Sequence, residues 1–399
     1  MSDRLSTGAQ THDRQGRLFL FLYALAWAGG AVAYVPLLTL LLPVQVTALS
    51  DGEQVSWIAT LAFAGAVSAS ISNIVFGWAS DITGRRRPWI AAGLVLSCIL
   101  LVNIGIATDL RTLTVAIVVW QAATNMMLAP LAAWAGDSVP DDQKGQLGGL
   151  LAIAPAAGAL AGAIVTWPGL VATDYRPLFV AALVLLCVLP LLLLGRPRAF
   201  PQLMLAPQVE TAPTPVLGMW GARFLVQVSE AALFAFLLVW LQTLSGGFRD
   251  NDAALLFGGV VVASIPIALL AGRWADKARR PILPLIVASI VAAAGLAIMS
   301  AAQGIVTAIS GYALFGIAGG VFLALHSAQT LRFLPRPERR GRDLGVFNLT
   351  NTLPSLIMPG IAATLVPLFG FDSMFTALAI LALCAACCLV VTMRWTQAS

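Results

Sequence analysis

The chain has 399 residues, of which 59% are apolar and only 10% are charged, and its formal net charge is +5. Soluble domains carry about 25% charged residues, so lipid must surround most of this chain. The two histidines are too few for a metal centre. The five cysteines fall inside apolar runs and indicate no disulfide framework. The positive charge does not require a nucleic-acid partner, because its placement between apolar runs explains it as a membrane topology signal.

Apolar runs of about twenty residues recur along the whole chain, and a helix of that length spans a bilayer. The runs are too long and too uniformly apolar to be barrel strands. We therefore expect an all-α integral membrane protein with twelve transmembrane helices. In chain order they begin near Leu18, Val55, Trp89, Thr112, Gln146, Pro177, Leu217, Ala253, Pro281, Ile305, Leu344 and Ser373.

The basic residues set the predicted orientation. With the N-terminus in the cytoplasm, 19 of the 23 Lys and Arg residues lie in cytoplasmic segments. Only Arg111, Arg176 and Arg249 lie outside, and Arg223 lies within a helix. This imbalance is a strong positive-inside signal. It predicts a multi-pass protein of the inner or plasma membrane with both termini in the cytoplasm.

The longest loop divides the chain into two similar parts. Residues 196–216 contain five prolines and few apolar runs, which is typical of a linker. We expect six-helix bundles over residues 1–195 and 217–399. Motif residues recur between these parts at offsets of 195 or 196, in the pairs Gly77 and Gly272, Asp81 and Asp276, Gly145 and Gly341, and Gly149 and Gly345. Several matches near one offset indicate a duplicated six-helix unit, and secondary transporters place their solute site between such units.

The segment GWASDITGRRRP, residues 77–88, resembles the signature loop between helices two and three of the major facilitator superfamily. The resemblance extends over the whole chain through helix count, linker and repeat, and it implies two pseudo-symmetric bundles in a monomer. GRRRPWI at 84–90, DSVP at 137–140 and DLG at 343–345 resemble the sucrose and glycoside–proton symporter branch. APAAG at 154–158 is similar to a fifth-helix motif of drug–proton antiporters.

The signature loop predicts a cytoplasmic latch. A carboxylate such as Asp81 can stabilise the positive N-terminus of a neighbouring helix, and the resemblance implies that this is the eleventh helix. Neighbouring arginines can pair with acids such as Asp137, and glycines allow close backbone approach. The alternative is that the arginines are topology signals only. The expected latch consists of Gly77, Asp81, Gly84, Arg85, Arg86 and Arg87, with Asp276, Arg279 and Arg280 in the second half.

Glu230 is the exception among 18 acidic residues, because the other 17 fall in loops or at helix ends. Acids within spans are costly in lipid and mark functional sites. Arg223, Gln227 and Glu230 share one face of the seventh helix, which should line a central cavity. We expect Glu230 to take up and release a proton and Arg223 to shift the pKa of its carboxyl group. A substrate-binding ion pair and a structural lock between helices remain alternatives.

Other polar side chains inside the spans are candidate substrate contacts. They are Gln227, Gln121, Asn125, Asn348 and Asn351, with the aromatic residues Tyr34 and Trp27 on the first helix. The alternative is that the amides hold helices together and that the aromatics fill space. His326, near the cytoplasmic end of the tenth helix, is expected to be solvated or part of the latch.

These features predict a proton-coupled secondary transporter of a small organic solute, a sugar or glycoside in the first instance. A drug or metabolite–proton antiporter is the alternative within the class. A cavity rich in Gln, Asn and Trp would favour sugar, and a mostly apolar cavity around Glu230 would favour lipophilic cargo. A non-transporting assembly or receptor protein is the alternative of another class. No nucleotide loop or nucleophile–base constellation is present, so we expect neither an enzyme nor a cofactor.

Overall fold

The structure, a computed structural model, describes residues 14–50, 52–140, 143, 147, 150–151, 153–198, 200, 214–278, 280–333 and 340–398. Within these ranges, the side chains of residues 214–216, 276, 327–333, 340–349, 351–352 and 396–398 are not described. Every regular element in the described ranges is helical.

The first span is built from three consecutive helical segments, α1 (Arg17–Pro36), η1 (Leu37–Leu41) and α2 (Leu42–Leu49). The middle segment is a π-helix that lies between two prolines, Pro36 and Pro43. Proline lacks the backbone N–H that an α-helix needs, and π-helical turns absorb such interruptions. The remaining elements of the first half are α3 (Gln54–Thr83), α4 (Arg86–Asn103), η2 (Ile104–Ile106), α5 (Leu110–Ser138), α7 (Ala154–Thr166), η3 (Thr173–Tyr175) and α8 (Arg176–Leu194).

The second half begins with α9 and ends in one very long helical segment, α13. Its elements are α9 (Thr214–Leu244), α10 (Asp250–Ala278), α11 (Leu283–Ser300), α12 (Ile305–Phe333) and α13 (Arg340–Ala398). α13 is two helices joined at Gly370, whose φ of 78° is unfavourable for residues with a side chain. Ten segments of the described chain are long and apolar enough to cross a membrane, and one of them contains this break. With the shorter apolar helix α7, the arrangement agrees with the twelve predicted passes.

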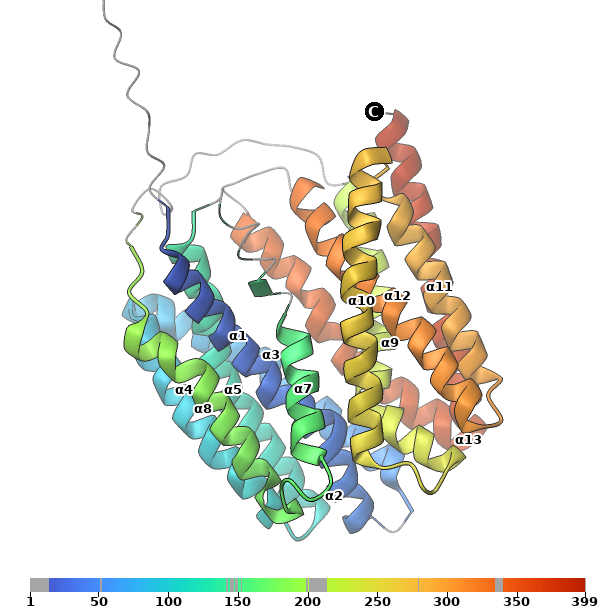
Figure 1. Cartoon of the computed structure of the whole chain (residues 1–399), viewed down its shortest axis with the longest axis horizontal. Coiled ribbons are helices and arrows are strands. Elements are labelled where there is room, and N and C mark those ends of the chain that lie inside the picture. Colours follow the sequence, from blue (N-terminus) through green and yellow to red (C-terminus); the bar gives the residue numbers. More distant parts are fainter. Residues whose placement is uncertain are drawn as a thin grey trace, which may run out of the picture.

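The helices form two bundles that stand side by side (Figure 1). In the first, α1 packs against α7 and α8, and α5 packs against α3 and α4. In the second, α13 packs against α9 and α11, and α12 packs against α10 and α11. Across the interface, α3 contacts α13 and α7 contacts α10, so in each case the second helix of one half meets the fifth helix of the other.

The two ends of the bundles differ in charge, and we name them by the predicted orientation. The inner end holds residues 80–87, 137–140, 277–278 and 280, and the outer end holds Arg111, Arg176 and Arg249. The start of α1 and the C-terminal part of α13 lie at the inner end, which is uppermost in Figure 1.

In each half, glycine allows two neighbouring helices to approach with almost no space between their backbones. A Cβ at Gly93 of α4 would lie 2.4 Å from the backbone nitrogen of Met127 in α5. A Cβ at Gly295 of α11 would lie 2.5 Å from the backbone nitrogen of Phe315 in α12. Small residues allow membrane helices to pack this closely. The tight packing therefore joins corresponding helix pairs within each half.

Asp109 caps the outer end of α5. Its carboxylate accepts hydrogen bonds from the backbone N–H groups of Thr112, at 2.9 Å, and Arg111, at 2.8 Å. The N–H groups of a first helical turn otherwise lack partners. These bonds favour the ionised carboxylate, so the pKa of Asp109 lies below its ordinary value, chiefly because of the bond from Thr112.

Candidate functional site

A cavity of about 380 Å³ lies between the two halves. Residues of α1, η1, α2, α3 and α5 line it from the first half, and residues of α9 and α13 line it from the second. The lining residues are Tyr34, Leu38, Leu42, Ile58, Leu61, Ala62, Ala66, Ala69, Ile117, Gln121, Asn125, Gln227, Glu230, Ala231, Phe234, Ala235, Phe236, Ser355, Met358 and Pro359. They lie along the middle and outer parts of their helices. The sequence-predicted residues Tyr34, Gln121, Asn125, Gln227 and Glu230 are thus brought together.

Asn125 organises the first-half wall of the cavity. Its side-chain N–H₂ donates to the Tyr34 hydroxyl at 3.0 Å and to the Gln121 backbone carbonyl at 2.9 Å. Its carbonyl oxygen accepts a hydrogen bond from Asn73 of α3 at 3.3 Å. The Tyr34 ring packs edge-on against Trp120, with 5.3 Å between centroids. This network joins α1, α3 and α5 and fixes the positions of the polar groups on this wall.

Sequence reasoning missed Asn73, although a signal was present. Asn73 is an amide in the membrane-spanning part of α3, where a polar side chain needs a hydrogen-bond partner. Gln121, one turn before Asn125, differs from the other amides of this wall. It is only 5% exposed, and its Oε1 has no hydrogen-bond partner in the described structure. A buried acceptor without a partner is costly, so the cavity itself must supply one.

Glu230 lies on the second-half wall, between α9 and α12. A Cβ at Gly319 of α12 would lie 2.8 Å from Glu230 Oε1, so the missing side chain of this glycine provides the space for the carboxylate. Tyr312, buried in α12, interacts electrostatically with Glu230. The carboxylate is thus held at the junction of two helices and also borders the cavity.

Arg223 lies two turns from Glu230 on α9, toward the inner end, and is buried behind the cavity wall rather than lining it. It interacts electrostatically with both Glu230 and His326. His326 is 0% exposed, its Nε2 lies 2.9 Å from the Met219 carbonyl oxygen, and its ring stacks on Phe322. The expectation that His326 is solvated was therefore wrong, because α9 and α12 enclose it.

The remaining predicted contacts lie elsewhere or outside the description. Trp27 is half-buried and packs against the core, and it is not among the cavity-lining residues. The side chains of Asn348 and Asn351 lie outside the described residues. On α13 the described lining is instead Ser355, Met358 and Pro359.

Most of the cavity wall is apolar. Alanine, leucine, isoleucine and phenylalanine side chains make up most of it, and no tryptophan lines it. The polar lining groups are Tyr34, Gln121, Asn125, Gln227, Glu230 and Ser355. Ligand pockets commonly combine such apolar walls with a few polar groups that fix orientation.

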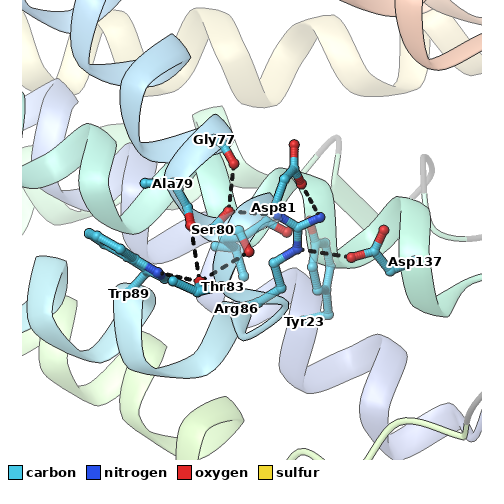
Figure 2. A network of polar contacts seen from close by, with 10 residues as sticks. Tyr23, Gly77, Ala79, Ser80, Asp81, Thr83, Arg86, Trp89 and Asp137 are labelled. Atoms are coloured by element: carbon cyan, nitrogen blue, oxygen red, sulfur yellow. Dashed lines mark hydrogen bonds and ion pairs between the residues drawn. The ribbon is translucent and has the colours of Figure 1, made fainter.

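Arg86 forms the centre of a charged cluster at the inner end (Figure 2). Its guanidinium contacts Asp81 at 2.5 Å and Asp137 at 2.9 Å, and it donates to the Ser80 hydroxyl at 2.6 Å. These residues come from the ends of α3, α4 and α5, which all belong to the first half. Asp81 itself is 62% exposed. The cluster ties one bundle together, and no described contact carries it to the second half.

The other residues of the predicted latch behave differently from Arg86. Arg85 is exposed, while Arg87 lies over the Trp134 ring at 5.5 Å and donates to the Gly195 carbonyl. Gly84 ends α3 with a φ of 60°, which requires its conformational freedom. A Cβ at Gly77 would meet only Ala129, at an ordinary 4.0 Å. In the second half Arg280 is exposed, and Arg279 and the Asp276 side chain lie outside the described residues.

At the outer end, charged and apolar contacts join the two halves. Arg176 at the start of α8 forms an ion pair with Asp250 at the start of α10. Beside it, Thr166 of α7 lies 3.5 Å from Asn251. A buried apolar cluster from both halves adjoins them and consists of Leu40, Ala163, Leu238, Ala253 and Ala254. The halves are therefore in direct contact between the cavity and the outer end.

Comparison with known proteins gives one family and similar folds. The sequence profile of the Major Facilitator Superfamily matches residues 18–248 and 219–398. The structure is similar to the human organic anion transporter MFSD10 (TETRAN), with a TM-score of 0.66 and 14% identity over 93% of this chain and 98% of that chain. It is also similar to a bacterial homologue of the human lysosomal transporter Spinster in an inward-facing, unoccupied conformation, with a TM-score of 0.64 and 16% identity over 94% and 96% of the two chains. No curated protein sequence matches. At these identities the similarity shows the fold alone.

Proposed function

This chain belongs to the Major Facilitator Superfamily and is a secondary transporter rather than an enzyme, and we propose that Glu230 couples its transport to protons. The predicted major facilitator fold of a multi-pass membrane protein is confirmed. The narrower resemblance to sucrose and glycoside–proton symporters stays a prediction. The orientation with both termini in the cytoplasm and action as a monomer are part of the proposal.

The observation that carries the proposal is the place of Glu230. It is an acid within a span, it borders the cavity between the halves, and its carboxylate lies against Gly319 of α12. A carboxylate at such a junction can bind a proton from one side of the membrane and release it to the other as the halves rock. Each charge that crosses provides about 2.3 kcal/mol per 100 mV, which is enough to drive accumulation.

The cavity walls support an amphipathic cargo in the first place. A mostly apolar lining favours the drug or metabolite–proton antiporter over the sugar symporter. A glycoside remains the second candidate, because Tyr34, Gln121 and Asn125 form a hydrogen-bonding wall. A structural neighbour is an organic anion transporter, but the carboxylate of Glu230 does not support the same cargo here. A cavity between two bundles also supports transport over a receptor or assembly role.

The test is solute-induced pH change in proteoliposomes, run over a panel of glycosides and lipophilic amines. We expect Glu230→Gln to abolish proton-driven accumulation of the solute that the panel identifies, and to leave solute exchange in place. Glu230→Asp, which keeps the carboxylate, should retain part of the coupling. Full accumulation by Glu230→Gln would show that the coupling group lies elsewhere.

A further inference from the structure

Among the described residues that line the cavity, Glu230 is the one that carries a charge. Arg223 interacts with it electrostatically but lies behind the wall, toward His326. A ligand in the cavity therefore meets the carboxylate directly and the guanidinium only through protein. Charge complementarity in such a site favours a cation, and an anion would be repelled by the nearer group.

The opposite wall presents a hydrogen-bond acceptor. Gln121 lines the cavity, is nine-tenths or more buried, and its Oε1 has no partner in the part of the chain that the structure describes. The neighbouring amide of Asn125 is already oriented, because its N–H₂ donates to Tyr34 and to the Gln121 backbone. A ligand N–H that reaches Gln121 would satisfy the buried oxygen, and satisfying such a group strengthens binding more than adding an exposed hydrogen bond does.

The rest of the wall selects for an apolar body. Phe234, Phe236 and Met358 from the second half face Leu38, Leu61 and Ile117 from the first across the cavity. Its volume of about 380 Å³ is within the range of small-molecule sites. Aromatic faces also attract cations. Mostly apolar and aromatic walls with a single charged group favour such a body over a sugar, because the many hydroxyls of a sugar each need a hydrogen-bond partner.

From this combination we infer that the cavity binds a lipophilic ammonium ion, with its charge at Glu230 and an N–H donated to Gln121. The inference deepens the proposed function by naming its substrate class. A protonated, neutral Glu230 lacks the charge that attracts the cation, so binding of the cation and of a proton exclude one another. This competition allows the transporter to exchange the cation for a proton. Among the described residues, the other titratable groups that face Glu230 are Arg223 on α9 and Tyr312 on α12, with Tyr34 on α1 across the cavity.

The experiment measures equilibrium binding to the purified full chain in lipid nanodiscs at pH 8, without any gradient. The probe is rhodamine 6G, a lipophilic cation with N–H groups, followed by fluorescence anisotropy. Competitors are tetraphenylphosphonium, a cation without N–H, octyl glucoside, a neutral amphipathic glycoside, and an anionic naphthalene sulfonate. We expect rhodamine 6G to bind, tetraphenylphosphonium to displace it more weakly, and the glycoside and the sulfonate not to displace it.

Two variants separate charge from hydrogen bonding. Glu230→Gln should weaken the binding of both cations at least tenfold. Gln121→Leu should weaken the binding of rhodamine 6G about fivefold, which is the effect of one hydrogen bond. The affinity for tetraphenylphosphonium should stay unchanged. Glu53→Gln is the matched control, because it removes an exposed carboxylate that does not line the cavity. Unchanged cation affinity in Glu230→Gln, or tighter binding of the sulfonate than of the cations, would overturn the inference.

A measurement on the unmodified protein covers the case in which a variant does not fold. In weak buffer, rhodamine 6G added to the wild-type protein at a pH where Glu230 is partly protonated should release protons, whereas octyl glucoside should not. Binding without proton release would refute competition at one carboxylate. Because no gradient is present, these results do not depend on transport. A protein that binds cations but fails the liposome test would retain this inference and lose the coupling proposal.

Discussion

The two ends of the molecule use their charges differently. At the inner end Arg86 joins Asp81 and Asp137, and all three belong to the first bundle. At the outer end Arg176 and Asp250 belong to different bundles, and an apolar cluster from both bundles adjoins them. The inner cluster therefore stabilises one half as a rigid unit, while the outer pair holds the halves together. In this conformation the contact between the halves lies on the outer side of the cavity.

This comparison changes the interpretation of the signature loop. Its resemblance predicts a latch from Asp81 to the eleventh helix, and in the described residues Asp81 pairs within its own half and is largely exposed. If the bridge from Asp81 to the eleventh helix forms only when the halves close at the inner end, it should be absent from a conformation that is closed at the outer end. The latch stays a prediction, and the following changes test each end separately.

Arg86→Ala should have the strongest effect on stability. The guanidinium is 14% exposed and is shared by two carboxylates and a hydroxyl, and its loss leaves Asp81 and Asp137 without their counter-charge. Because Asp81 is well solvated, we expect the free energy of unfolding to fall by about 2–3 kcal/mol. Breaking a fully buried ion pair costs more, about 3–5 kcal/mol. Thermal unfolding in detergent measures the loss of stability. Arg85→Ala, at the exposed neighbour, is the control and should change little.

Arg176→Glu should act on the relation between the halves rather than on one half. Like charges at residues 176 and 250 would repel across the interface. A penalty of about 1.4 kcal/mol would change the population of states open at the outer end about tenfold. Labelling of a cysteine placed at Ala62, in the cavity lining, by an impermeant reagent from the outer side measures that population, in a background without the native cysteines.

The reversed pair Arg176→Glu with Asp250→Arg provides the control for this change. It restores opposite charges, so labelling at position 62 should return close to its original rate. A double variant as open as the single one would mean that the ion pair does not hold the halves together. Arg86→Ala should leave this labelling rate unaltered, since its cluster lies within one half.

Asp109→Ala should have the smallest effect, because it removes a cap from one exposed helix end and leaves both bundles and their interface intact. The bonds to Thr112 and Arg111 lower the pKa of Asp109, so its stabilising contribution is present above the unfolded pKa, near 3.9. It is lost as the pH falls through the folded value. The melting temperatures of the two proteins should therefore differ slightly at pH 7, and the difference should shrink as the pH is lowered below the unfolded pKa. A difference that does not shrink as the pH is lowered would contradict this account.

The features that the sequence alone predicted are those that depend on local physical chemistry. Twenty apolar residues in a row have few structures open to them in lipid other than a helix, so the number of spans and their approximate starts follow from hydropathy. Glu230 could be identified as exceptional because an acid within a span is costly wherever the helix lies. Gln121 and Asn125 share a face because they are one turn apart. Each of these conclusions depends only on residues close in sequence.

The features that require partners distant in sequence were decided by tertiary structure. Arg176 and Asp250 are 74 positions apart and meet only because α8 and α10 start at the same end of adjoining bundles. Asn73 reaches Asn125 across α3 and α5, and His326 is buried because α9 covers it. Helical periodicity places a side chain on a face, but it does not say which helix packs there. That choice comes from the packing of whole helices, which set the composition of the cavity and its apolar character.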